Sequence, residues 1–151
     1  MTIGFPISTK RVLVVEDEYL VAMDMSSYLE AAGAEVVGPA SNVNAALEVL
    51  ERTELDAAIL DIDLRGELAY PVADALTARG IPFVFTTGCD PGNMPARFAN
   101  VRRCTKPATP ESVSRALFGV PALRMRLYRH RPPCADTSDV KTIARLASHL
   151  R

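Results

Sequence analysis

The feature that most constrains the fold is an alternation of short apolar runs with segments of helical periodicity. Five runs are rich in apolar residues and end in turn or polar residues, which is typical of strands buried on both faces. These runs occupy residues 11–15, 35–39, 57–61, 82–88 and 101–107. Apolar residues at spacings of three and four follow the first three runs and the fifth. Such alternation predicts parallel βαβ units with right-handed crossovers.

Five strands and their helices within residues 10–120 predict a flavodoxin-like, doubly wound α/β domain with a five-stranded parallel sheet in the order 2-1-3-4-5. The connection between the fourth and fifth runs is irregular, because residues 89–100 contain two prolines and a glycine. At most one helical turn fits there, around residues 96–99. We therefore expect a degraded fourth helix.

Charge divides the chain into an acidic body and a basic tail. The formal net charge is −1, but residues 121–151 contain seven Lys or Arg and only two Asp. We expect an N-terminal segment over 1–9, one domain over 10–120 and a basic C-terminal extension over 121–151. A helix is predicted over 138–150 from apolar residues at helical spacing, namely Val140, Ile143, Leu146 and Leu150. This stripe needs a surface, which is its own domain, a second copy or a partner protein.

Composition limits the classes of site and environment. No apolar run is long enough to span a bilayer, and the first ten residues lack the apolar core of a signal peptide. Both histidines, His130 and His149, lie in the extension, which excludes a histidine-based catalytic or metal site in the main domain. Three cysteines without metal-like spacing favour a reduced, cytoplasmic setting. A single predicted helix in the extension argues against nucleic-acid binding.

Polar residues stand at the carboxyl ends of four predicted strands. Because the carboxyl ends of parallel strands meet at one edge of a sheet, we expect these side chains to lie close together. A single acid that closes a buried strand is more often a solvated cap, so the inference depends on the combination. The residues are Glu16, Asp17, Asp61, Asp63, Thr87 and Lys106.

This combination indicates phosphoryl chemistry with a divalent cation. Clustered carboxylates repel one another and have raised pKa values unless a cation lies among them. Oxygen ligands with room for water suit Mg²⁺, with Mn²⁺ as an alternative. A lysine and a hydroxyl beside the metal offer a point charge and a donor to a phosphoryl group. One carboxylate can then become an aspartyl phosphate.

Four motifs resemble the receiver domain of two-component response regulators over about residues 10–120: Val14-Val15-Glu16-Asp17-Glu18, Leu60-Asp61, Thr86-Thr87-Gly88 and Lys106-Pro107. Residues 64–67, 70–76 and 83–88 resemble more narrowly the single-domain alphaproteobacterial FAT GUY regulators. That subgroup typically partners histidine kinases of the HWE and related types.

The resemblance implies a metal site with defined ligands. Asp61 would accept phosphate from a kinase histidine. Asp17 and Asp61 would ligate Mg²⁺ directly, and Glu16 would act through water. The backbone carbonyl of Asp63 would complete the protein ligands.

The resemblance also implies residues that handle the phosphoryl group. Thr87 would donate its hydroxyl to it, and Lys106 would pair with it. Asp63 and Cys89 would flank the attacking water and tune the lifetime of the phosphate, or both are solvated loop residues.

Three departures from the receiver pattern affect signalling more than chemistry. Arg103 stands where receivers usually carry an aromatic residue, three positions before the lysine. No tyrosine follows the Thr-Gly pair within residues 89–92, although the narrower subgroup places one there. The fourth helix is degraded. The phosphate chemistry is therefore expected to be intact, while its route to a partner is open.

Three candidate functions are consistent with these sequence features to different degrees. The first is a stand-alone receiver, a non-enzymatic signalling module that takes phosphate from a histidine kinase or phosphotransfer protein as intermediate or sink. The second is a docking or homodimerisation module without phosphorylation. The third is a haloacid-dehalogenase-like phosphatase, suggested by Asp61-Ile62-Asp63. In that class the strand usually opens the domain and a second acidic cluster follows late, and this chain has neither feature.

Overall fold

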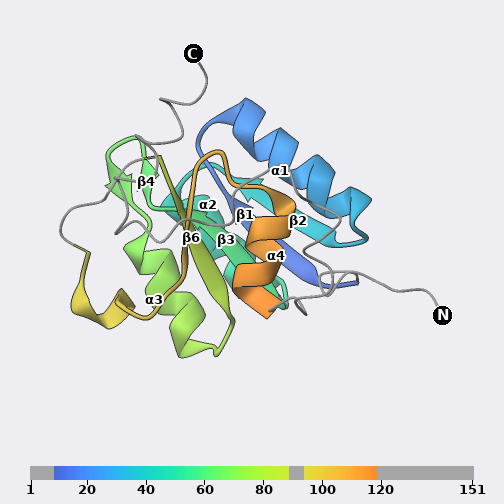
Figure 1. Cartoon of the computed structure of the whole chain (residues 1–151). Coiled ribbons are helices and arrows are strands. Elements are labelled where there is room, and N and C mark those ends of the chain that lie inside the picture. Colours follow the sequence, from blue (N-terminus) through green and yellow to red (C-terminus); the bar gives the residue numbers. More distant parts are fainter. Residues whose placement is uncertain (1–8, 89–93, 119–151) are drawn as a thin grey trace, which may run out of the picture.

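A computed structural model describes residues 9–88 and 94–118 (Figure 1). Five parallel strands form one sheet in the order β2-β1-β3-β6-β7, which confirms the predicted flavodoxin-like topology. A second, two-stranded sheet joins β4 and β5. The five main strands are β1 (Arg11–Val15), β2 (Glu35–Ala40), β3 (Ala57–Asp61), β6 (Phe83–Thr87) and β7 (Arg103–Thr105).

Helices cover both faces of the sheet, and each face has its own apolar core. Residues such as Val14 and Ile59 pack with α1 and α4 on one face, while Leu60 and Phe85 pack with α2 and α3 on the other. Successive side chains of a strand point to opposite faces, so the continuous apolar runs serve both cores. The helices are α1 (Tyr19–Ala31), α2 (Val43–Arg52), α3 (Tyr70–Ala78) and α4 (Pro110–Phe118).

Two side chains satisfy the first N–H groups of α2. Asn42 is the N-cap of α2, and its Oδ1 accepts from Ala45 N at 2.8 Å. Glu67, from a distant connection, accepts from Val43 N with its Oε1 at 3.1 Å. The start of α2 is therefore tied to the segment that follows β3.

The end of α1 and the start of α4 each carry a residue suited to that position. Gly33 follows α1 with a φ of 93°, a left-handed conformation suited to a residue without a side chain. Thr109 caps α4, because its Oγ1 accepts from Ser112 N at 3.1 Å.

A small hairpin after β3 was not predicted. Its strands β4 (Asp63–Leu64) and β5 (Glu67–Leu68) are antiparallel. The two residues between them, Arg65 and Gly66, have φ values of 56° and 88°. Both central residues of a type I′ turn need positive φ, a conformation that usually selects Asn-Gly or Asp-Gly. With arginine at the first position, the sequence carries only half of that signal.

The connection between β6 and β7 contains little regular structure, as expected from its prolines and glycine. Within the described residues 94–102, one 3₁₀ turn is present, η1 (Ala96–Phe98). This turn falls within the predicted position at 96–99, and it replaces the fourth helix of the βα pattern.

The short turn is nevertheless anchored to the body. Phe98 is only 2% exposed, and its ring lies 5.3 Å from that of Tyr70 and 5.6 Å from that of Phe85. Arg97 donates two hydrogen bonds to Asp74 of α3, at 2.8 and 3.1 Å. This part of the connection therefore packs against α3 and β6.

Some expectations fall outside the described residues or need correction. The helix predicted over 138–150 and the site residue Cys89 lie outside them. Cys104 is a buried residue of β7 and is disulfide-bonded, so the expectation of reduced cysteines is wrong for this residue. Among the helices of the described part, none has the length and apolar character to cross a bilayer.

We predict that Gly38→Ala destabilises the fold by about 2–4 kcal/mol. Gly38 has a φ of 95°, and an added Cβ would lie 2.8 Å from the backbone nitrogen of Ala40. Gly80→Ala is the matched control, since Gly80 has a φ of 67° but no atom within 4 Å of the new Cβ. The control should cost only about 1–2 kcal/mol. Urea unfolding measures both, and equal losses would show that the sheet accommodates the extra carbon.

Candidate functional site

Three carboxylates meet at the carboxyl edge of the sheet, as predicted. Ligand oxygens of Glu16, Asp17 and Asp61 all lie within 4.8 Å of one another. Val15 pairs with Leu60 in the sheet register. Glu16 and Asp61 are the next residues of the two chains, so they lie side by side at the ends of neighbouring strands. Glu16 is 6% exposed and Asp61 is 5% exposed. Three acids so placed at a buried edge require a balancing positive charge.

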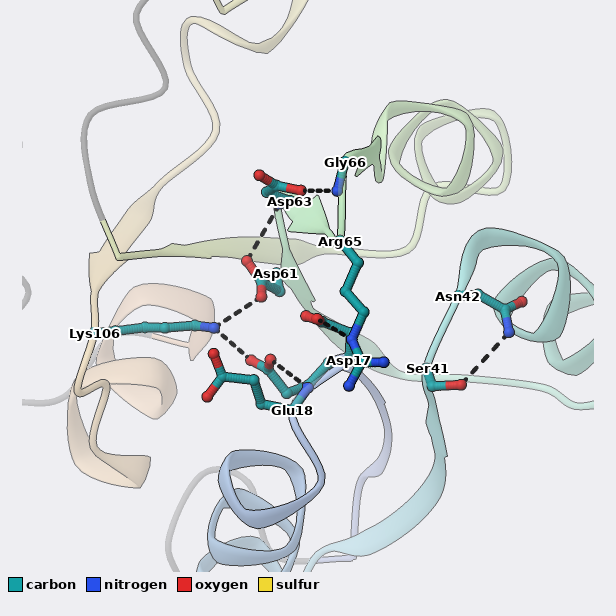
Figure 2. Close-up of polar contacts among 10 residues, drawn as sticks. Asp17, Glu18, Ser41, Asn42, Asp61, Asp63, Arg65, Gly66 and Lys106 are labelled. Carbon is teal, nitrogen blue, oxygen red and sulfur yellow. Dashed lines mark hydrogen bonds and ion pairs between the residues drawn. The ribbon is translucent and has the colours of Figure 1, made fainter.

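Lys106 supplies part of that charge from the end of β7. Its Nζ lies 2.7 Å from Oε2 of Glu16 and 2.8 Å from Oδ2 of Asp61, so one ammonium bridges two carboxylates (Figure 2). Its backbone N–H donates to the carbonyl of Thr87 at 2.9 Å. The lysine is therefore positioned by the end of β6 as well as by the acids that it contacts.

Asp63 lies near the site, but its side chain belongs to the hairpin. Its Oδ1 accepts from Gly66 N at 2.6 Å, and the carboxylate points toward the hairpin in Figure 2. Its backbone N–H donates to Oδ1 of Asp61 at 3.3 Å. Asp63 therefore contacts Asp61 through its backbone N–H, while its side chain stabilises the turn of the hairpin. The predicted site residue Thr87 closes β6 and is 5% exposed.

Arg65 is a site residue that sequence reasoning did not identify. Its Nε lies 3.2 Å from Oδ2 of Asp17, and its side chain is 78% exposed (Figure 2). The left-handed turn of the hairpin carries the arginine to this position. The only sequence signal was the Arg-Gly pair that begins two residues beyond Asp63, which by itself predicts no contact.

The acids are also oriented by the backbone around them. Oε1 of Glu16 accepts from Glu18 N at 3.1 Å, at the start of α1. Together with the contacts of Lys106, this hydrogen bond uses both oxygens of Glu16. The cluster is a fixed arrangement of oxygen ligands rather than a set of solvated loop acids.

Comparison with protein families matches residues 12–102 to the response regulator receiver domain. The chain belongs to this family. The solution structure of SdrG from Sphingomonas melonis Fr1 is similar, with 44% identity and a TM-score of 0.63 over 71% of this chain and 92% of that one. The predicted receiver fold is thereby confirmed, and the likeness to SdrG supports the resemblance to the FAT GUY subgroup as well.

Two longer proteins are also similar to this receiver. The response regulator PhyR from Brucella abortus has 30% identity and a TM-score of 0.62, over 82% of this chain and 54% of that one. The transcriptional regulatory protein PdtaR of Mycobacterium tuberculosis has 27% identity over 136 residues. These residues are 89% of this chain and 65% of PdtaR, so the chain spans about two thirds of this relative.

Burial and the shared lysine together shift the pKa values of the receiver site. Burial raises the pKa of Glu16 to about 7, although hydrogen bonds from Lys106 and Glu18 oppose the rise. Burial likewise raises the pKa of Asp61, against the hydrogen bond from Lys106. Burial acts to lower the pKa of Lys106, but its bonds to the two acids outweigh this effect and raise it. One lysine thus does not fully stabilise two buried carboxylates.

The residues present fit a magnesium ion. Hard oxygen donors from two or three carboxylates, with space for water and phosphate oxygens, are what Mg²⁺ selects. The raised pKa values of Glu16 and Asp61 show that the cluster has less positive charge than its ionised form needs. A divalent cation beside Asp17 would provide that charge.

We predict that Arg65→Gln increases the affinity for Mg²⁺ up to about fivefold, because an exposed ion pair contributes roughly 0.2–1 kcal/mol. The guanidinium neutralises Asp17 and competes with a metal for its oxygen. Arg11→Gln is the matched control, since Arg11 pairs with Glu35 at 3.4 Å on the exposed surface and contacts none of the cluster acids. Isothermal titration calorimetry measures the affinity. A weaker affinity in Arg65→Gln would mean that the arginine supports the metal site.

We predict that the metal-free protein loses on the order of 2 kcal/mol of stability as the pH rises from about 5 to above 7. The pKa of Glu16 rises from 4.5 to about 7 on folding, so the folded state binds the proton more tightly. This contribution is present at low pH and is lost as the pH passes through the folded pKa. Urea unfolding in a chelator measures the loss, and Glu16→Gln should reduce it. An unchanged loss in that variant would assign the proton elsewhere.

Proposed function

We propose that this receiver accepts a phosphoryl group on Asp61 from a histidine kinase, in a Mg²⁺-dependent reaction, and acts as a signalling intermediate or phosphate sink. One observation carries the proposal. The buried carboxylate of Asp61 lies beside two further acids and is hydrogen-bonded to Lys106 at 2.8 Å. A nucleophilic carboxylate, a candidate metal site and a cation for the phosphoryl oxygens are thus together at one edge of the sheet.

In this proposal the acids and the lysine divide the work. Asp17 and Asp61 would ligate Mg²⁺ directly, Glu16 would act through water, and the backbone carbonyl of Asp63 would complete the protein ligands. When bound, the ion neutralises charge on the phosphoryl oxygens. An oxygen of Asp61 attacks phosphorus, the bond from phosphorus to the kinase histidine nitrogen breaks, and the histidine keeps the electron pair.

Lys106 and Thr87 hold the transferred group. The ammonium of Lys106 turns from the bare carboxylates to a phosphoryl oxygen, and the hydroxyl of Thr87 donates to another. Support comes from the hydrogen bond between Lys106 N and the carbonyl of Thr87, at 2.9 Å, which couples the ends of β6 and β7. A further similar structure is the BeF3-activated conformation of SdrG, with 42% identity and a TM-score of 0.61.

The segment that follows Thr87 is the proposed route to a partner. Movement of Thr87 and Lys106 toward the phosphate would act on residues 88–100. Because Phe98 and Arg97 pack against α3, the response must loosen or shift this anchor rather than order a free loop. Asp63 and Cys89 tune the lifetime of the phosphate by limiting access of water to it.

The remaining assignments extend the proposal. The phosphodonor is a sensor histidine kinase of the HWE or a related type, or a phosphotransfer protein. A second copy of the chain is a further proposed partner, in a homodimer. The receiver covers 10–120 between an N-terminal segment and a basic extension over 121–151. It works in the cytoplasm as a phosphoacceptor rather than as an enzyme with an external substrate.

We predict that acetyl phosphate with Mg²⁺ adds one phosphoryl group to the wild type and none to Asp61→Asn, because the amide is a poor nucleophile. Asp56→Asn is the matched control: it makes the same change on an exposed residue just before the other end of β3. Intact mass over time follows the adduct, and its decay distinguishes a short-lived sink from a lasting signal. A chelator should prevent labelling.

Equal labelling of Asp61→Asn and the wild type would reject Asp61 as the acceptor. If acetyl phosphate and purified histidine kinases all fail to label the wild type, the hypothesis of a docking or dimerisation module replaces the proposal. That hypothesis is favoured by the presence of Arg103, instead of an aromatic residue, at the start of β7.

A further inference from the structure

The proposed function gives no role to Arg65, although its side chain contacts the acid cluster. Nε of Arg65 donates to Oδ2 of Asp17 at 3.2 Å. In the part of the chain that the structure describes, this is the single hydrogen bond of the guanidinium. An arginine has five N–H donors, and this side chain is 78% exposed. Most of its donors are therefore available to a ligand at the site.

The guanidinium lies one carboxylate away from the proposed phosphoacceptor. It contacts Asp17, whose ligand oxygen is within 4.8 Å of that of Asp61. In the view of Figure 2, Lys106 and Arg65 reach the acids from opposite sides. A phosphoryl group has three terminal acceptor oxygens, so it offers sites for an arginine besides those for Lys106 and Thr87. Arg65 is thus placed beside the group that Asp61 would carry.

The backbone that carries Arg65 is held on both sides. Asp63, two residues before it, donates its N–H to Oδ1 of Asp61 at 3.3 Å. Glu67, two residues after it, accepts from Val43 N at 3.1 Å at the start of α2. Exposed side chains change rotamer within nanoseconds. The guanidinium can therefore exchange partners by rotation of its side chain alone, while the hairpin stays in place.

The charge of the site shows when a second cationic side chain is needed. Three ionised acids lie beside one lysine, so a divalent ion brings this cluster to neutrality. Phosphoryl transfer then replaces the single negative charge of Asp61 with about two. Neither Lys106 nor the metal compensates this added charge. Among the described residues, Arg65 is the remaining cationic side chain with an ion pair to the cluster.

We propose that Arg65 is a phosphoryl-binding residue, which pairs with Asp17 in the resting receiver and with the phosphoryl oxygens after transfer to Asp61. Asp17 is thereby released to serve as a metal ligand, and the planar guanidinium suits phosphoryl oxygens better than a single carboxylate oxygen. This inference rests on the proposed function, because it needs Asp61 as the acceptor. It implies that loss of the guanidinium strengthens Mg²⁺ binding but weakens the binding of a phosphoryl group.

Beryllofluoride at saturating Mg²⁺ tests the proposal without phosphoryl transfer, since BeF₃⁻ adds to a carboxylate oxygen as an unreactive mimic of a phosphoryl group. Amide shifts of the ¹⁵N-labelled full chain follow the titration and give the affinity. We expect Arg65→Gln to weaken BeF₃⁻ binding about three- to tenfold. Arg65→Lys keeps the charge without the planar fork and should weaken it less. Arg11→Gln, which removes an exposed arginine paired with Glu35, should leave it unchanged.

Three results would overturn the inference, and they separate it from the proposed function. Equal BeF₃⁻ affinities in the wild type and Arg65→Gln would remove Arg65 from the phosphoryl group and leave Asp61 as the acceptor. A parallel loss of Mg²⁺ and BeF₃⁻ affinity in Arg65→Gln would show that the arginine only supports the hairpin. BeF₃⁻ binding that is no tighter in the wild type than in Asp61→Asn would reject the acceptor itself, and with it the proposed function.

Discussion

The site depends on one ammonium group shared between two buried carboxylates. Glu16 and Asp61 close neighbouring strands and are nearly inaccessible to water, so neither can be ionised there without a close cation. Lys106 comes from β7, two strands from β3, which is a distance of about 10 Å across the sheet. The extended lysine and the Asp61 side chain together span that distance only if the lysine backbone is held at the edge. The carbonyl of Thr87 provides this hold, so the strand order itself determines whether the ion pairs can form.

Two cationic side chains pair with the acid cluster, and they differ in their exposure to water. Lys106 is largely enclosed and bridges two acids, whereas the Arg65 side chain is 78% exposed and pairs with Asp17. Water screens the arginine pair, which makes it easy to exchange for a metal ion. The lysine pair is costly to break unless another group takes its charge. A metal ion can therefore replace the Arg65 charge that the hairpin supplies, while the Lys106 charge at the end of β7 stays in the site.

Strands, sheet order and site edge could be predicted from the sequence because each has a regular signal. Buried parallel strands are continuous apolar runs, and topology rules then place their carboxyl ends together. The β4–β5 hairpin carried no such signal, since strands of two residues show no periodicity and Arg65 occupies a position usually held by Asn or Asp. The ion pair of Arg65 with Asp17 could not be found without it. The anchoring of Phe98 was missed for a related reason, because one aromatic residue in a Pro-rich segment does not reveal its neighbours.

The connection from Glu16 to Glu18 links the chemistry of the site to the surface of α1. Glu16 binds Lys106 through one oxygen and Glu18 N, at the beginning of α1, through the other. A change of charge at the cluster therefore acts directly on Glu18, the residue at the N-cap position of α1. Conversely, any segment that packs on α1 contacts an element whose first turn is hydrogen-bonded to a candidate metal ligand. The exposed apolar residues of α1 thus lie on a helix whose N-cap residue, Glu18, is hydrogen-bonded to the acid cluster.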